Sequence, residues 1–243
     1  MKIKGKKIEI TAGIHKIERV RGANCYLVIS GNEMLMVDAG MPHNGNRIIN
    51  YIKGIGENPS NLKLIVLTHA DLDHIGSAAE LKQMTGAKLA IHSEDSPILS
   101  GKVGMKIVKG PLGLLFKLMY PLVRFHPIEP DIILKDDMDV AGFKVVHVPG
   151  HTRGSICLYQ PSKIIFVGDT FRSDSAGNPK LSSKALAIKV EQFQASQRII
   201  SELDFDILLP GHGPPVKGKA SIRVKKLFKD WNPDVQIQHT KNK

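Results

Sequence analysis

Four short apolar runs in this chain each end in histidine or aspartate, and this repeated pattern limits the fold more than any other feature. The runs are LKLIVLTH (62–69), FKVVHVPGH (143–151), KIIFVGDT (163–170) and DILLPGHG (206–213). Their apolar and β-branched residues favour buried strands. In two of them Pro-Gly precedes the histidine, which indicates a sharp, exposed turn. If these strands lie side by side with aligned ends, their polar residues meet at one edge of a sheet.

Strand and helix patterns alternate along the rest of the chain. CYLVIS (25–30) and EMLMVDAG (33–40) flank Gly31-Asn32, which predicts a β-hairpin. Further strands are predicted over 87–92, 131–137 and 155–160. Apolar residues at helical spacing predict helices over 44–55, over about 75–84 and from Ser182 or Ser183 to Leu203. This order indicates an α/β fold with helices on the outer faces of the sheets.

Residues 97–130 interrupt the alternation. They are apolar and punctuated by glycine and proline, and residues 96–128 contain five basic side chains and no acidic one. We expect an inserted, lid-like segment over the sheet edge where the polar residues meet, which would favour an apolar substrate. A homodimer contact or a peripheral membrane patch is the alternative.

The C-terminal residues form a second basic segment. Residues 217–243 contain eight lysines and arginines against two aspartates, and residues 217–229 are partly amphipathic. We therefore expect a main domain over 1–216 and a basic helix and tail over 217–243, packed on that domain or extending from it.

Composition excludes several classes of protein. Cys25 and Cys157 are the two cysteines, each in an apolar run, so a disulfide framework is not indicated. We find no signal peptide and no run of roughly 20 apolar residues, and we expect a cytoplasmic protein without stable membrane insertion. The net charge of +11 favours anionic partners such as nucleic acid, but a basic protein with a small-molecule substrate is the interpretation that we prefer.

The polar residues at the strand ends are those of a metal centre. Imidazole and carboxylate ligands together suit zinc, iron and manganese. One such residue alone has an ordinary structural explanation, but seven in four turns do not. The candidate metal ligands are His69, Asp71, Asp73, His74, His151, Asp169 and His212.

With these residues the sequence resembles the metallo-β-lactamase-fold superfamily. The matching motifs are LTHADLDHIG (67–76), VPGHTRGSICLY (148–159), FVGDTF (166–171) and LLPGHGPPV (208–216), in order within roughly residues 8–216. The resemblance implies a four-layer αββα sandwich with two divalent metal ions, zinc first and iron or manganese as alternatives. It assigns His69, Asp71 and His151 to the first metal, Asp73, His74 and His212 to the second, and Asp169 to a bridge between them.

Asp71 departs from the family pattern. H-x-H-x-D-H becomes His69-Ala70-Asp71-Leu72-Asp73-His74, with Asp71 in place of the second histidine. Two divalent metals, three aspartates and a bridging hydroxide make a formally neutral cluster, one positive charge fewer than usual. Such a cluster is a weaker Lewis acid, and its first site favours harder metals such as Mn²⁺ or Fe²⁺. Because carboxylate is shorter than imidazole, an Asp71 that fails to reach would leave only the second site well filled.

The resemblance implies a hydrolase in which a metal-bound hydroxide attacks a carbonyl carbon or a phosphorus. Asp73 and Asp169 are the expected catalytic residues, with Asp73 or a bound water as the proton donor. We expect cleavage of an ester, lactone, thioester or similar small-molecule bond. A phosphodiesterase or nuclease acting on an anionic substrate is the alternative, which the positive charge supports. A metal-binding protein with a redox or non-catalytic role is the third hypothesis.

Three neighbouring residues are expected to orient the ligands. Asp38, in VDAG, is expected to hydrogen-bond the loop that follows residue 66, while Thr68 and Thr152 flank ligand histidines. Six histidines lack the clustering at strand ends and are left out of the site: His15, His43, His92, His126, His147 and His239.

Overall fold

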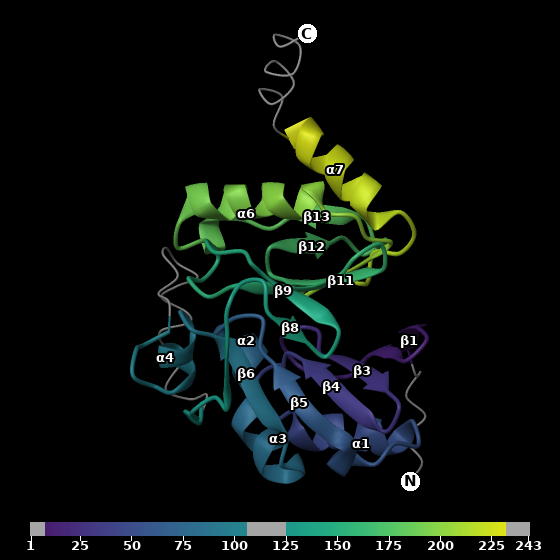
Figure 1. The fold of residues 1–243 in the computed structure, drawn as a ribbon, viewed down its shortest axis with the longest axis vertical. Coiled ribbons are helices and arrows are strands. Elements are labelled where there is room, and N and C mark those ends of the chain that lie inside the picture. Colours follow the sequence, from purple (N-terminus) through teal and green to yellow (C-terminus); the bar gives the residue numbers. More distant parts are fainter. Residues whose placement is uncertain (1–7, 106–124, 232–243) are drawn as a thin grey trace, which may run out of the picture.

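Two β-sheets packed face to face form the centre of the molecule (Figure 1). The computed structural model describes residues 8–105 and 125–231. The larger sheet has the strand order β1-β2-β3-β4-β5-β6-β7, antiparallel from β1 to β4 and parallel from β4 to β7. Its strands are β1 (Ile8–Thr11), β2 (Ile14–Lys16), β3 (Tyr26–Ser30), β4 (Glu33–Val37), β5 (Leu62–Val66), β6 (Lys88–His92) and β7 (Ile132–Leu134).

The second sheet has the order β14-β11-β10-β9-β8, with β14 parallel to β11 and the other pairs antiparallel. Its strands are β8 (Asp139–Val140), β9 (Phe143–His147), β10 (Ile156–Gln160), β11 (Ile164–Gly168) and β14 (Ile207–Pro210). A separate short hairpin joins β12 (Phe171–Ser173) to β13 (Pro179–Leu181).

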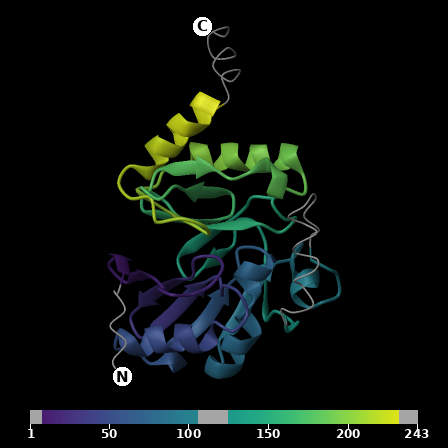
Figure 2. The ribbon, with the colours of Figure 1, turned by 180° about the vertical axis from the view of Figure 1, so that it is seen from behind.

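Helices cover the outer face of each sheet, as both views show (Figures 1 and 2). Helices α1 (Gly45–Gly54) and α3 (Ala78–Thr85) pack on the larger sheet through residues such as Ile48 and Leu81, and α6 (Val190–Glu202) and α7 (Ala220–Trp231) cover the second. A third core lies between the sheets and contains Val66, Phe143, Phe166 and Leu209. The expected αββα sandwich is confirmed.

The predicted helix over 75–84 is wrong in its extent. The chain forms α2 (Leu72–Ile75), turns at Gly76 and Ser77, and then forms α3. A Cβ at Gly76 would lie 2.3 Å from Pro42 Cδ, so the chain passes too close for a side chain there. The hydroxyl of Ser77 donates to Met41 O at 2.7 Å. The separate α2 carries two of the candidate ligands.

The predicted helix from Ser182 or Ser183 to Leu203 is also wrong, because it is interrupted. A 3₁₀ turn over Lys184–Leu186 (η3), which Ser183 caps through Ala185 N, precedes α6. Between them, the N–H groups of Ile188 and Lys189 donate to Gly150 O at 2.8 and 3.2 Å. The carbonyl of Gly150 thus binds two N–H groups that would bind carbonyls of the same helix if the helix were continuous.

The unusual segments lie partly outside the described residues. Residues 106–124 of the expected 97–130 insertion and residues 232–243 of the tail are among those that the structure does not describe, so the lid stays a prediction. Of the insertion's ends, Ile98, Met105, Phe125 and Ile128 pack against the core of the larger sheet. A short α4 (Ser96–Leu99) begins it, and a 3₁₀ turn η1 (Pro59–Asn61) precedes β5. Over 8–105 and 125–231, no helix combines the length and apolarity needed to cross a membrane.

Candidate metal centre

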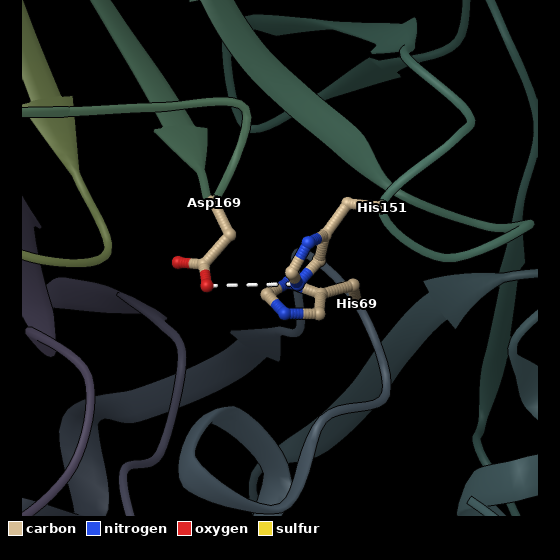
Figure 3. Close-up of side chains that lie close together, drawn as sticks. All are labelled: His69, His151 and Asp169. Carbon is tan, nitrogen blue, oxygen red and sulfur yellow. Dashed lines mark ion pairs between the residues drawn. The ribbon is translucent and has the colours of Figure 1, made fainter. Parts of the chain in front are cut away.

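The carboxyl ends of strands from both sheets bring the seven candidate ligands together. His69 follows β5, and Asp71, Asp73 and His74 lie at or within α2. His151 follows β9, Asp169 directly follows β11, and His212 follows β14. Figure 3 shows His69, His151 and Asp169 pointing toward one another from three separate segments. The alignment of strand ends expected from the sequence therefore produces one polar cluster.

Two groups of three residues each have their donor atoms within 4.8 Å of one another. The first cluster is His69, His151 and Asp169, and the second cluster is Asp73, His74 and His212. In the second, His212 Nε2 lies 3.2 Å from Asp73 Oδ2. Asp169 connects the two, because its Oδ2 lies 3.5 Å from His151 Nε2 while its Oδ1 lies 3.2 Å from His74 Nε2.

Asp71 reaches the first cluster. Its Oδ2 accepts a hydrogen bond from His151 Nε2 at 3.0 Å and lies 3.6 Å from His69 Nε2. The shorter side chain at this position therefore still brings an oxygen close to both imidazoles. Its role as a ligand stays a proposal.

The donor atoms fit a bound cation. His69 Nε2, His74 Nε2 and Asp169 Oδ1 are buried and have no hydrogen-bond partner in the described part of the chain. Buried polar atoms without partners cost free energy, which a coordinated metal would remove. Donors around tetrahedral zinc lie about 3.4 Å apart, as metal–ligand distances near 2.1 Å require. Asp71 Oδ2 lies 3.0 Å from His151 Nε2 and 3.6 Å from His69 Nε2, and Asp169 Oδ2 lies 3.5 Å from His151 Nε2, all near that value.

Gly211 leaves the space that the second cluster occupies. A Cβ there would lie 2.4 Å from Asp169 Oδ1 and 2.7 Å from His74 Cε1. Its N–H donates to Gly168 O at 2.7 Å, which ties the loop after β14 to the end of β11. In the Pro-Gly-His sequence, the backbone of Gly211 therefore packs against Asp169, in addition to the side chain of His212.

Asp38 contacts the loop after β5 and the Nδ1 side of the His74 imidazole, as expected from the sequence. Its Oδ1 accepts from Thr68 N at 2.8 Å, and its Oδ2 lies 2.8 Å from His74 Nδ1. The Thr68 hydroxyl contacts Asp38 and also lies 3.1 Å from His69 Nδ1. If the hydroxyl donates to Asp38 and accepts from His69, both Nδ1 atoms carry protons and both Nε2 atoms face the cluster. Asp38 has a left-handed backbone conformation (φ 61°).

Two further positioning residues were not identified from the sequence. Asn24 Nδ2 donates to Pro210 O at 2.8 Å and to Gly213 O at 2.7 Å, which holds the loop of His212. Asp95 hydrogen-bonds the loops of His69 and His151. Asn24 precedes a predicted strand, and Asp95 follows strand β6 by three residues. Their positions next to strands are the only sequence signal that indicates a role in positioning the ligands.

Charge coupling is strong within the cluster. Burial alone would raise the pKa of Asp169, but His74 and His212 outweigh it and hold that pKa well below its usual range. Burial opposes a charge on His74 as well, yet Asp38, Asp169 and Asp73 raise its pKa well above normal. The carboxylates of Asp169 and Asp73, which lie 3.5 and 3.2 Å from His212 Nε2, raise the pKa of His212 to about 9. Without a cation, protons on histidines therefore balance the carboxylates.

Comparisons with known proteins agree with this geometry. The family model described as the metallo-beta-lactamase superfamily matches residues 19–212. The probable metallo-hydrolase YflN of Bacillus subtilis is 28% identical over 237 residues, covering 88% of this chain and 89% of that protein.

Solved structures share the fold. BJP-1, a subclass B3 metallo-β-lactamase of Bradyrhizobium japonicum, has a TM-score of 0.70 at 19% identity, with 98% of this chain and 97% of that one covered. The class B3 di-zinc metallo-β-lactamase LRA-12, from an Alaskan soil metagenome, has a TM-score of 0.66 at 20% identity, with 98% and 94% covered. At these identities the likeness concerns the fold alone.

Proposed function

The chain belongs to the metallo-β-lactamase superfamily and is a metal-dependent hydrolase, and from this premise we propose that it binds two divalent metal ions and cleaves an ester, lactone, thioester or similar bond of a small molecule. The observation that carries the proposal is a set of three buried atoms, His69 Nε2, His74 Nε2 and Asp169 Oδ1, which have no hydrogen-bond partner among residues 8–105 and 125–231. Zinc is the first choice, which the di-zinc neighbour supports, and iron or manganese are the alternatives.

In this proposal each ion has its own residues. His69, Asp71 and His151 would hold the first ion and Asp73, His74 and His212 would hold the second, with Asp169 shared between them. One Asp169 oxygen lies near His151 and the other lies near His74, which supports this shared role. Asp71 takes part because its oxygen lies within 3.6 Å of both imidazoles of the first cluster.

When bound, the ions supply Lewis acidity and bring the pKa of a water to about 7. Asp73 is the residue that accepts the proton released by this water. Its side chain is 31% exposed and so can reach substrate, whereas that of Asp169 is 10% exposed. Although burial raises the pKa of Asp73, His74 and His212 lower it below its usual value, so Asp73 begins as a carboxylate that can accept a proton. It then passes this proton to the leaving group. Asp169 stays ionised throughout because its pKa is held far lower.

A phosphodiesterase or nuclease is the second candidate. The net charge of +11 favours it, as does helix α7, in which Lys225, Lys226 and Lys229 are exposed. The same metal centre can serve attack on a phosphorus. The cytoplasmic location and a homodimer also stay predictions.

Metal analysis combined with a substrate panel tests the proposal. The purified chain should contain about two transition-metal ions. It should cleave at least one of a set of chromogenic esters, lactones and thioesters, whereas cleavage of bis-phosphodiesters alone would favour the second candidate. The double variant His69→Ala/His151→Ala should lose the first ion and most of the activity. His126→Ala, an exposed histidine outside the site, should keep its metal. Full activity of the double variant would contradict the two-metal proposal.

A further inference from the structure

Asp95 is a fully buried aspartate beside the metal centre that the proposed chemistry does not use. It lies three residues after β6 and immediately before α4. Aspartate at this position commonly caps a helix, but its side chain makes no capping hydrogen bond to α4. No cationic side chain in the described ranges lies within ion-pair distance of it. A buried carboxylate of this kind is costly unless its hydrogen bonds hold other parts of the structure.

Each hydrogen bond that the Asp95 carboxylate accepts comes from a segment that carries a proposed ligand. Ala70 N, between His69 and Asp71, donates to Oδ2 at 2.9 Å. The hydroxyl of Thr152, which follows His151, donates to the same oxygen at 2.6 Å. Gly154 N, in the same turn, donates to Oδ1 at 2.8 Å. One carboxylate thus fixes both segments that carry the first ion's residues.

These two segments belong to different halves of the molecule. Ala70 lies between β5 of the larger sheet and α2, whereas Thr152 and Gly154 connect β9 to β10 in the second sheet. Packing adds to the hydrogen bonds, because a Cβ on Gly154 would lie 2.7 Å from Asp95 N and 2.8 Å from Asp95 Cγ. The position of His151 relative to His69 therefore depends on a contact that crosses between the sheets.

The second cluster is held by other residues. Asp38 contacts His74, and Asn24 and Tyr26 bind the carbonyl of Pro210 in the loop of His212. These contacts come from β4, β3 and the residues beside them. A change at Asp95 leaves these hydrogen bonds in place, so its effect should be confined to one of the two ions.

We propose that Asp95 is the positioning residue of the first metal site, where it sets the separation of His151 from His69 and Asp71 and thereby the affinity for one ion of the pair. This inference rests on the proposed two-metal function. Asp95→Asn is the informative change, because an amide has one acceptor oxygen and its NH₂ group must face at least one N–H or O–H donor. The Thr152 and Ala70 segments would then lose part of their shared anchor.

The test measures zinc affinity by competition with a chromophoric chelator. It uses two parent variants, each of which retains only one of the two metal sites. In His212→Ala, which keeps the first site, Asp95→Asn should weaken zinc binding by about 10- to 100-fold, as for other residues that orient ligands. In His69→Ala, which keeps the second site, the same change should alter affinity by less than about threefold, since the hydrogen bonds of Asp38 and Asn24 remain. Cobalt absorption spectra of both backgrounds report which ligand field changes.

Two more variants guard against a general folding defect. Gly154→Ala pushes on Asp95 without removing its charge, and it should reproduce the selective loss at the first site. Asp131→Asn is the control, because Asp131 also accepts a backbone N–H, from Leu89 in β6, the strand that precedes Asp95, but lies away from the site. It should leave both affinities unchanged.

Equal weakening of both sites, or no weakening in either Asp95→Asn or Gly154→Ala, would overturn the inference. If Asp95→Asn does not fold, the Gly154→Ala result decides alone. A wild-type chain that binds no zinc, iron or manganese contradicts the proposed function and with it this inference. Two ions bound with unaltered affinities in the variants would contradict the inference alone.

Discussion

Asp38 Oδ2 and His74 Nδ1 lie 2.8 Å apart, and both side chains are buried. This contact joins the end of β4 to the short helix α2, over 36 residues of sequence. It leaves His74 Nε2 facing Asp169 at 3.2 Å, inside the metal centre. The orientation of His74 therefore depends on a carboxylate that does not itself belong to either cluster.

Replacing this carboxylate should weaken the second metal site. In Asp38→Asn the single amide oxygen can accept from Thr68 N or from His74 Nδ1, but not from both, which costs about 1–3 kcal/mol of stability. Asparagine tolerates the left-handed backbone at this position, so the loss comes from the hydrogen bonds. We expect metal affinity and activity to fall by about 10- to 100-fold. Chelator competition and thermal melts measure both effects. The exposed Asp230→Asn should change neither, and an Asp38→Asn variant with wild-type affinity would contradict the assignment.

Residues close in sequence account for what could be predicted. The apolar runs, the Gly31-Asn32 hairpin and the two Pro-Gly-His turns depend on local chain properties, and they place His69, His151 and His212 just after strands. The α/β order with outer helices followed from the same pattern, and the four-layer αββα sandwich followed from the family resemblance.

Contacts between distant segments account for what could not be predicted. Gly150 O binds the N–H groups of Ile188 and Lys189 and thereby divides a helix that its own apolar spacing favours. Asp95 resembles a helix cap in the sequence, and only the approach of Thr152 from the other sheet gives its side chain another role.

The pKa of His212 predicts a pH dependence in the metal-free protein. A histidine titrates near 6.5 when unfolded, and Asp169 and Asp73 raise the pKa of His212 to about 9 in the fold. The raised folded-state pKa stabilises the protein fully below about pH 6.5, and this stability is lost as the pH rises toward about 9. Because the side chain is 44% exposed, the loss should be about 1 kcal/mol at most.

Thermal melts of chelator-treated protein between pH 6.5 and 8.5 measure this loss. His212→Gln should show a flatter dependence, since it lacks the titrating group. The buried thiols of Cys25 and Cys157, whose pKa values burial raises, affect both proteins equally. Parallel curves for the two proteins would contradict the coupling of His212 to Asp169 and Asp73.

Asp71→His restores the usual family pattern and adds one positive charge to the proposed cluster. A more positive cluster lowers the pKa of bound water, so the acidic limb of the kcat/KM profile should move to lower pH by about one unit. Preference should also shift from manganese or iron toward zinc. A pH–rate profile with each metal checks both effects. Asp71→Asn makes the same change in charge but supplies no imidazole ligand, so it should weaken binding of the first ion without the shift of metal preference toward zinc.

The two glycines Gly211 and Gly54 provide a matched pair that tests how tightly the second cluster is packed. A Cβ on Gly211 would lie 2.4 Å from Asp169 Oδ1, whereas a Cβ on Gly54, at the end of α1, meets nothing within 4 Å. Gly211→Ala must therefore displace Asp169 or the loop of His212, and we expect loss of metal and a fall in activity of at least about 100-fold, as small displacements at reacting centres produce. Gly54→Ala should keep metal and activity and gain up to about 1 kcal/mol of stability, because alanine favours a helix over glycine. Metal content after dialysis and thermal melts of both variants give the comparison. A Gly211→Ala protein that keeps two ions would mean that the cluster adapts to an added methyl group, against the close packing of Asp169, His74 and Gly211.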